Sequence, residues 1–232
     1  MTNISNEDEQ TKYTVFLVNE CAAERNFWIF LDTPQGLPGQ GVFANTDANI
    51  SVLPNYKGIN KFTVPLQYSI GAGSSNEKVG LEVRIDSQIT KDTRLGQTLS
   101  AKYQTVPPKQ GPQLTHDRTL SSPSNSINVN TNTFDRVKNE DNKWFSNMSF
   151  GIKSPNGFMG YTWSPGANEK YIIVPKFRFF VTTGSFTENS LADINVISNG
   201  SVAIERSDFL NFEATVKLTS RGTWELFKGK VI

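Results

Sequence analysis

The chain has 232 residues, of which 37% are hydrophobic, 11% aromatic and 19% charged. Its 23 basic residues nearly balance 22 acidic ones, so the net charge of +1 gives no long-range field to steer nucleic acid or anionic lipid. A single histidine, His116, and a single cysteine, Cys21, exclude an internal disulfide and zinc clusters and remove most of the side chains used by hydrolases.

Alternating apolar and polar residues predict short strands along the first half of the chain. Residues 13–18 are apolar on both faces, so we expect that strand in the interior of a sheet. Pro65 has no N–H to donate, which places the strand over residues 61–69 at an edge or a bulge. The glycine-rich residues 71–75 lack the lysine and helix of a phosphate loop and predict a hairpin turn. Two more strands are expected over residues 26–31 and 78–85.

The amino-acid composition changes between residues 105 and 125, where four prolines and few apolar residues predict a loop or linker. The segments beside it, residues 97–105 and 127–133, are rich in Ser, Thr and Asn and alternate like strands. Two interpretations stay open for residues 97–133. They form a hairpin protruding from a sandwich edge, or a membrane-inserting hairpin of a pore-forming or insecticidal-type toxin.

The second half again predicts short strands separated by turns. Asn199-Gly200 is a strong hairpin signal between two of them, and no window longer than about ten residues shows a helical period. We therefore expect an all-β, antiparallel β-sandwich of jelly-roll or Greek-key type. A disordered tail over residues 1–10 would precede one domain over residues 11–232, with a loop or hairpin insertion around residues 105–142. The strands expected here cover residues 144–150, 157–162, 176–186, 193–197, 202–204, 212–218 and 223–227.

Catalytic patterns are scarce, and we expect a protein that is not an enzyme. His116 lies beside Asp117, but the chain has no G-x-S-x-G nucleophile motif. The S-x-x-K match from Ser75 to Lys78 precedes a predicted strand where a helix would be needed. A hydrolase that uses carboxylates alone, as glycosidases do, remains an alternative. Nothing in the sequence pairs the acidic residues available for it, which are Glu82, Asp86, Glu205 and Glu213.

No cofactor or metal is expected. Residues 135–142 offer oxygen ligands of the kind that calcium prefers, but their spacing matches no calcium loop and suits a solvated acidic turn. Cys21 follows the first strand and has no histidine near it in the sequence, so we expect a small buried hydrophobic residue there.

The tryptophans lie mostly in apolar runs, where packing in the core is expected. Trp163 differs, because it ends a strand and enters a turn, so two roles are open for it: a structural anchor or an exposed indole. An exposed indole beside amide and hydroxyl groups stacks on sugar rings in glycan-binding lectins. The candidate ligand-binding residues are Tyr161, Trp163 and Asn168.

The first ten residues contain no basic and apolar segments of a secretory signal, and no run approaches the roughly 20 apolar residues of a membrane helix. With one cysteine as well, we expect a cytoplasmic protein or one released without a classical signal peptide.

The order of these segments resembles the RhiA-like (rhizosphere-expressed) proteins of rhizobia and other bacteria. The likeness lies in YTVFLVN at 13–19, NFWIFLDTP at 26–34 and KFTVPLQYS at 61–69, then in SFGIK at 149–153 and YIIVP at 171–175, and in the closing hairpin with its Thr-Trp. It covers most of the chain outside residues 105–142. It implies an abundant, non-catalytic protein made during association with a host, and it transfers no site residues.

Together these observations predict surface recognition or assembly in a bacterial host-association setting. The expected partners are a protein or glycan surface, or further copies of the chain, and not nucleic acid. A membrane is expected as partner only if residues 97–133 insert, and a lectin is the other alternative.

Overall fold

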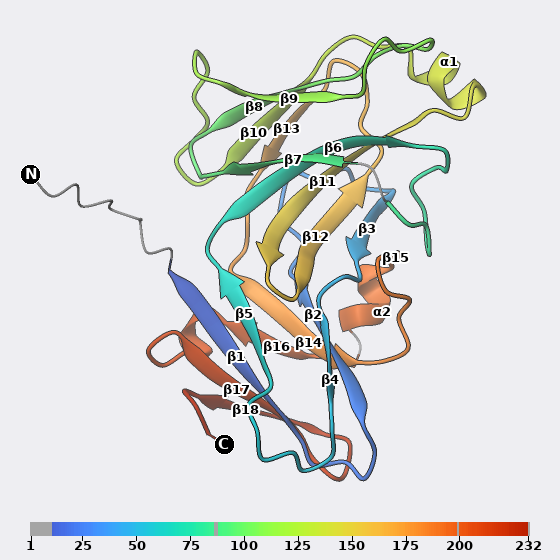
Figure 1. The fold of residues 1–232 in the computed structure, drawn as a ribbon. Coiled ribbons are helices and arrows are strands. Elements are labelled where there is room, and N and C mark those ends of the chain that lie inside the picture. The colour runs from blue at the N-terminus through green and yellow to red at the C-terminus, as the bar shows by residue number, and fades with distance from the viewer. Residues whose placement is uncertain (1–10, 86–87, 199, 232) are drawn as a thin grey trace, which may run out of the picture.

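The computed structural model describes residues 11–85, 88–198 and 200–231, and strands dominate these residues (Figure 1). The described chain forms four sheets packed together, with most strand pairs antiparallel. The expected all-β, antiparallel sandwich class is confirmed. The predicted tail over residues 1–10 lies outside the described residues. The helices found are short: α1 (Arg136–Asp141), α2 (Ile194–Ser198) and the 3₁₀ turn η1 (Arg206–Asp208).

A six-stranded sheet, called here the central sheet, lies in the middle of the molecule in Figure 1. Its strands are β3 (Val42–Asn45), β6 (Tyr68–Ser75), β7 (Gln88–Thr93), β11 (Phe145–Ser154), β12 (Gly157–Trp163) and β15 (Leu191–Ala192). They follow the order β15-β3-β12-β11-β6-β7, so the long hairpin β11–β12 lies in the interior of the sheet.

Three four-stranded sheets surround the central sheet. The upper sheet contains β8 (Thr98–Lys102), β9 (Gln113–Asp117), β10 (Ile127–Thr131) and β13 (Lys170–Ile173), in the order β13-β10-β8-β9. The β14 sheet contains β2 (Arg25–Leu31), β4 (Asn49–Val52), β14 (Arg178–Thr183) and β16 (Val202–Glu205), in the order β16-β14-β2-β4. The β17 sheet contains β1 (Lys12–Asn19), β5 (Lys61–Pro65), β17 (Glu213–Leu218) and β18 (Trp224–Lys228), in the order β18-β17-β1-β5.

The two faces of the central sheet differ in side-chain size. Because strand side chains alternate and opposite residues share a face, the register of β11 with β12 and β6 places their large apolar side chains together. Trp163 on this face contacts Tyr171 of β13 in an edge-on geometry, with ring centroids 5.5 Å apart. The Tyr161 hydroxyl donates to the carbonyl of Leu31 on β2 at 2.7 Å. The apolar face therefore packs against both the upper sheet and the β14 sheet. It comprises Ile70, Ala72, Met148, Phe150, Ile152, Met159, Tyr161 and Trp163, all 1% exposed or less.

Several strand predictions are confirmed. β1 lies between β17 and β5, as expected for a strand that is apolar on both faces. β5 is an edge strand, as expected, but it ends at Pro65, so the strand predicted over residues 61–69 is divided and residues 68–69 belong to β6 of the central sheet. The strands predicted over residues 144–150 and 157–162 pair as the hairpin β11–β12, and the closing hairpin forms as β17–β18.

The hairpin predicted over residues 97–133 is wrong, because its two arms do not pair antiparallel. Its two arms, β8 and β10, are parallel neighbours, with Asn128 opposite Thr98 and Thr131 opposite Ala101. β9, from within the predicted loop, instead pairs antiparallel with β8. Since a parallel pair needs a crossover of a dozen or more residues, the proline-rich segment serves as that crossover and contributes a strand of its own.

Residues 78–85, predicted as a strand, contain no strand. Leu81 is 56% exposed, and Glu82 has a φ of 62°, in the left-handed region. The backbone N–H of Glu82 donates to the carbonyl of Leu191 at 2.8 Å, which ties the segment to the sheet as a loop. The place beside β6 belongs to β7, a polar strand that suits a sheet edge.

Two further segments differ from expectation. The strand predicted over residues 193–197 does not form, because residues 194–198 form α2, and β16 pairs with β14 in place of the predicted hairpin. In α2 the Asp193 carboxylate accepts from the N–H of Asn195 at 2.8 Å, and Ile197 is buried. This hydrogen bond satisfies a backbone N–H in the first turn of the helix, and the alternation of apolar and polar residues in the sequence does not reveal it. Asn199 of the predicted turn lies outside the described residues. The glycine-rich residues 71–75, predicted as a turn, lie within β6.

Phe150 tests the apolar face. It is fully buried and stacks on Tyr68 with ring centroids 5.5 Å apart. We expect Phe150→Ala to lower the free energy of unfolding by about 3–5 kcal/mol, because it leaves a cavity between sheets. Urea unfolding checks this, with Leu120→Ala, at a 51% exposed position, as the control expected within about 0.5 kcal/mol of wild type.

Candidate binding site

The three predicted ligand-binding residues do not share one exposed surface. Tyr161 is 1% exposed and Trp163 is fully buried, because β12 continues through Trp163 and carries its indole into the core. The exposure considered for Trp163 is therefore wrong, and its place in the core fits the structural-anchor alternative. Burial also raises the pKa of Tyr161 well above its ordinary range. Asn168 is exposed, with a φ of 57°, and its side-chain oxygen accepts from Thr133 at 2.7 Å.

His116 and Cys21 also have defined places. His116 is exposed on the edge strand β9, where a loop had been predicted, opposite Leu99. Neighbouring Asp117 accepts from the hydroxyl and N–H of Thr119, and these hydrogen bonds lower its pKa. Cys21 is buried, as expected, and its thiol donates to the carbonyl of Thr219 at 3.4 Å.

The carboxylates considered for a hydrolase do not converge. Glu205 lies at the end of β16 and pairs with Arg178 at 3.5 Å, whereas Glu213 begins β17 in another sheet. Asp86 lies outside the described residues. Within the ranges that the structure describes, no group of three or more His, Cys, Asp or Glu side chains is arranged to hold a metal ion.

The second face of the central sheet carries small and polar side chains that are nevertheless buried. Ser69, Asn147, Ser149 and Thr162 are each 2% exposed or less. Glycines of β6, β11 and β12 lie between them, which makes this face shallow.

A hollow of about 210 Å³ opens over this polar face, and we call it the Phe158 hollow. That volume is below the roughly 300–1,000 Å³ of pockets for drug-sized ligands, so it suits one small ring. Three other hollows are larger, at about 610, 520 and 260 Å³. The first is lined without an aromatic ring, the second has His116 in its lining and the third has Phe186. The Phe158 hollow is lined by Asn45, Asp47, Ser69, Ile85, Gln88, Thr90, Lys153, Ser154, Gly157 and Phe158.

Gln88 of β7 reaches across the polar face to β11. Its side-chain nitrogen donates to the Asn147 oxygen at 2.9 Å, and its oxygen accepts from the Ser149 hydroxyl at 2.9 Å. The bridge passes over Gly71, where an added Cβ would lie 2.6 Å from the Gln88 oxygen and 2.2 Å from the Ser149 oxygen. Glycine at this position therefore makes the bridge possible, and the bridge holds one wall of the hollow.

The Phe158 ring lies across two glycines of the polar face. A Cβ added at Gly151 or at Gly160 would come within 2.7 Å of ring atoms of Phe158. The phenyl group therefore rests on bare backbone, while its partly exposed side borders the hollow. Glycine at both positions leaves room for this aromatic ring in the wall of the hollow.

Asp47 supplies a carboxylate at the edge of the hollow. Gly157, with a φ of 128°, allows the β11–β12 turn to approach the Asp47 backbone, since a Cβ there would lie 2.5 Å from the Asp47 carbonyl. Burial raises the pKa of the Asp47 carboxyl from 3.8 to about 6. Among the described residues, no hydrogen bond or ion pair to this carboxyl is found, so its acceptor oxygens are open to a ligand.

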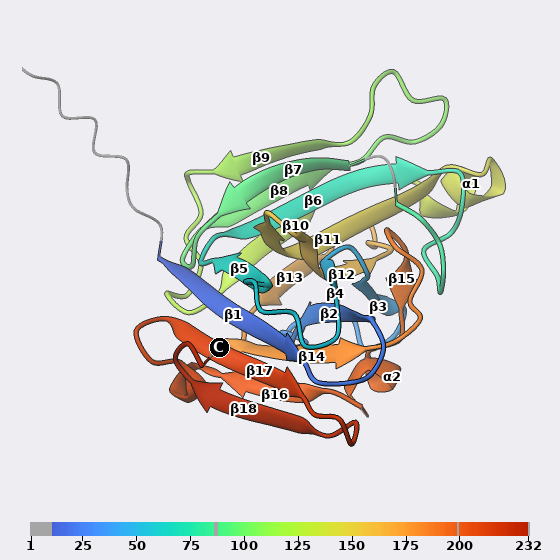
Figure 2. The same cartoon turned by 60° about the horizontal axis from the view of Figure 1, so that its bottom comes forward.

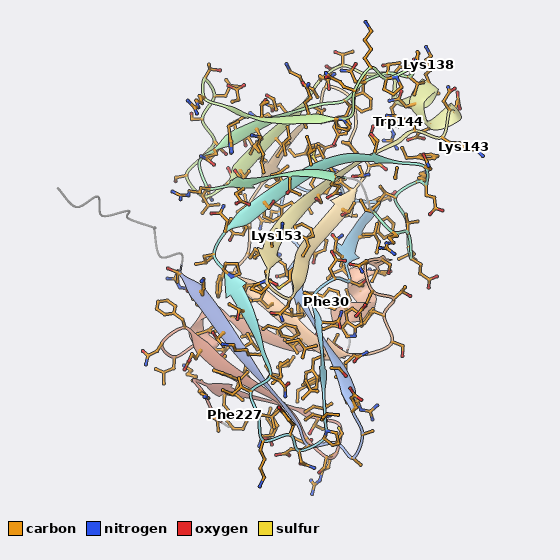
Figure 3. The ribbon with its side chains drawn as sticks, in the orientation of Figure 1. Phe30, Lys138, Lys143, Trp144, Lys153 and Phe227 are labelled. Atoms are coloured by element: carbon orange, nitrogen blue, oxygen red, sulfur yellow. The ribbon has the colours of Figure 1, made fainter. Side chains whose placement is uncertain are left out.

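Other polar groups complete the rim. Asn45 accepts from the Thr162 hydroxyl at 3.1 Å through its oxygen, which leaves its amide hydrogens for a ligand. Lys153 lies at the end of β11 near the turn to β12, far from Lys138 and Lys143 beside α1 (Figure 3). The hollow thus offers donors, acceptors, a cation and an aromatic face within one small space.

Sequence reasoning did not identify this site. The signal was present in the glycine and serine residues that alternate along β6 and β11, at positions 69, 71 and 73 and at 149 and 151. Such alternation marks a strand with one face of minimal side chains, where another group can approach the backbone.

Comparison with known proteins gives no relative: no family model, curated protein or solved structure matches the chain. A search of the described helices finds none long and apolar enough to cross a membrane.

Gln88→Ala tests the bridge. It leaves the Asn147 oxygen and the Ser149 hydroxyl buried without their partner, so we expect a loss of about 1–3 kcal/mol in the free energy of unfolding. Urea unfolding measures the loss. Thr90→Ala, at an exposed position two residues along the same strand, is the matched control, and an equal effect of both changes would contradict a structural role for the bridge.

Asp47→Asn tests the buried carboxyl through pH. The folded state binds the Asp47 proton more tightly than the unfolded chain, so the contribution of Asp47 to stability falls as pH rises from about 4 through about 6. We expect Asp47→Asn to be more stable than wild type at pH 7, with the difference disappearing near pH 4. Urea midpoints at both pH values check this, and Asp92→Asn, at an exposed position of β7, controls for loss of one negative charge.

Proposed function

We propose that the protein is a non-enzymatic carbohydrate-binding β-sandwich that holds one sugar ring in the Phe158 hollow. The observation that carries the proposal is the Phe158 ring, whose Cε1 and Cζ atoms lie over Gly151 and Gly160, in a lining that also holds the open Asp47 carboxyl. This keeps the glycan surface expected from the sequence as the partner and moves the contact from Trp163 to Phe158.

A sugar ring matches this set of groups better than an apolar or a purely ionic ligand. Its C–H face packs on an aromatic ring, and its hydroxyls both donate and accept hydrogen bonds. Asp47 accepts from hydroxyls, whereas the Asn45 amide donates to them and the Thr90 hydroxyl does both. An apolar ligand would leave these polar groups without partners at a cost in affinity.

The absence of catalysis is also part of the proposal. Asp117 is engaged by Thr119, and the only histidine of the chain has no described carboxylate partner to orient it. The Asp47 carboxyl lies in the hollow without a second acidic side chain in its lining, whereas glycoside hydrolysis uses a pair.

The RhiA-like resemblance and the host-association setting remain part of the same proposal, because recognition of glycans suits a protein made during contact with a host. The toxin alternative has no favouring observation in the described residues. β8 and β10 both lie in the interior of the upper sheet, so releasing them would break that sheet apart.

Binding of the purified protein to a glycan array tests the proposal. We expect retention on a subset of glycans and a loss of about tenfold or more in affinity for Phe158→Ala, since the stacking surface is removed. Phe158→Leu keeps apolar volume without the ring and should lose most of the same affinity.

Tyr56→Ala, at an exposed aromatic position outside the hollow, is the matched control and should bind as wild type. Retention of no glycan by the wild-type protein, or equal affinity for wild type and Phe158→Ala, would overturn the proposal.

A further inference from the structure

Three loops meet at one end of the molecule, and we call them the tip. They are residues 20–24, 53–60 and 219–223, which join β1 to β2, β4 to β5 and β17 to β18. They lie together at the bottom of Figure 1, and Figure 2 turns this end toward the viewer.

The tip exposes large apolar side chains. Leu53 is 51% exposed, Tyr56 52% and Ile59 57%, all within one loop. The Tyr56 ring folds over Gly58, where an added Cβ would lie 2.3 Å from a ring carbon, so this tyrosine packs on its own loop and not in the core. Exposed apolar side chains that cluster in one short segment indicate a contact surface, whereas isolated exposed apolar residues do not.

Buried hydrogen bonds hold the loops in place. The Asn19 side chain is 1% exposed and donates to the carbonyls of Ala23 and Val52 at 2.9 and 2.8 Å. Its backbone carbonyl accepts from the N–H of Asn55 at 2.7 Å. The Cys21 thiol is hydrogen-bonded to the Thr219 carbonyl, so all three loops are held at the end of β1. The exposed apolar groups are therefore presented by a fixed scaffold.

Charge at the tip favours anions. Lys57 and Arg221 lie on the loops, and Arg25 and Lys61 begin the strands that leave them; among the described residues, none of the four forms an ion pair. Of the acidic groups there, Glu20 and Glu225 share Lys217 at 3.2 and 3.4 Å. Glu24 accepts from the Ser51 hydroxyl and keeps its charge. Together with Lys217, the cations outnumber these three carboxylates.

A polar hollow of about 610 Å³ lies at the start of β2, and its lining includes Ser51, two residues before Leu53. Arg25, Asn26 and Ser51 line it together with Glu24 and residues 183–185. A guanidinium and an amide beside exposed apolar side chains suit a phosphate group on a lipid whose chains lie next to it.

From these observations we propose that the tip docks on the surface of an anionic phospholipid membrane. Leu53, Tyr56 and Ile59 enter the interface between headgroups and acyl chains, and Arg25 contacts a headgroup phosphate. Tyrosine and lysine are side chains that settle at this interface, with apolar parts inward and polar ends in water. The balanced overall charge provides no steering at long range, so the attraction acts within about one Debye length, 8–10 Å.

A protein partner is the competing occupant, and the observations favour lipid. The three exposed apolar side chains come from one short loop, in which Lys57 follows Tyr56. A stable protein interface needs about 800 Å² of matched surface on each side. Self-association through the tip is kept as an outcome of the experiment.

Sedimentation with vesicles tests the proposal. We expect wild-type protein to bind vesicles of phosphatidylcholine with phosphatidylserine, and to bind pure phosphatidylcholine several-fold more weakly. The combined variant Leu53→Ser, Tyr56→Ser and Ile59→Ser should bind both about tenfold or more weakly, because the inserted area is lost. Arg25→Glu with Lys57→Glu should abolish the preference for phosphatidylserine.

The matched control is Leu95→Ser, Leu120→Ser and Val137→Ser, three changes at exposed positions away from the tip, which should bind like wild type. Circular dichroism and glycan binding should be unchanged in every variant, which separates this proposal from the Phe158 hollow. Absence of wild-type protein from the vesicle pellet overturns the proposal. The proposal is also overturned if the combined Leu53→Ser, Tyr56→Ser and Ile59→Ser variant binds vesicles as tightly as wild type. A third overturning result is a wild-type dimer that this variant abolishes while it still binds vesicles.

Discussion

Large side chains of the central sheet crowd onto one face, and this unequal distribution organises the molecule. Met148, Phe150 and Ile152 of β11 point with Tyr161 and Trp163 of β12 toward the upper sheet and the β14 sheet, which together bury them. The opposite face must then be closed by little more than backbone, short hydroxyls and the Gln88 bridge. A core filled from one side leaves a shallow polar surface on the other, and the Phe158 hollow occupies that surface.

The two proposed contact regions differ in how they are built. In the Phe158 hollow, regular strands hold the groups, and glycines at 71, 151 and 160 let a side chain lie directly on the sheet. At the tip, loops hold the groups, and one buried asparagine, Asn19, replaces the missing strand pairing between them. Both depend on a side-chain amide, Gln88 or Asn19, that satisfies buried polar groups around it, which is the condition for polar groups to be kept in a protein interior.

The sequence carries the fold class, the strand β1 in a sheet interior, the edge position of Pro65 and the two long hairpins, because alternation and turn residues are local signals. It does not carry the partner of each strand. Residues 78–85 alternate as well as any strand, yet the polar β7 takes the place beside β6, since an edge needs little apolar surface. Trp163 looked like the end of a strand near a turn, but one more residue of pairing with Val42 keeps it in the core. The hollow was missed because glycine and serine are inconspicuous until two strands bring them side by side.

β1 and β17 are parallel neighbours although one lies near the beginning of the sequence and the other near its end. During synthesis on a ribosome, β1 leaves the exit tunnel long before its partner exists, and only β5 is available to cover one of its edges. The other edge stays unpaired until residues 213–218 have emerged. Non-local pairing of this kind slows folding and prolongs the exposure of an apolar strand. The edge of β1 is therefore open to pairing with a wrong strand for most of the time that residues 20–212 take to be made.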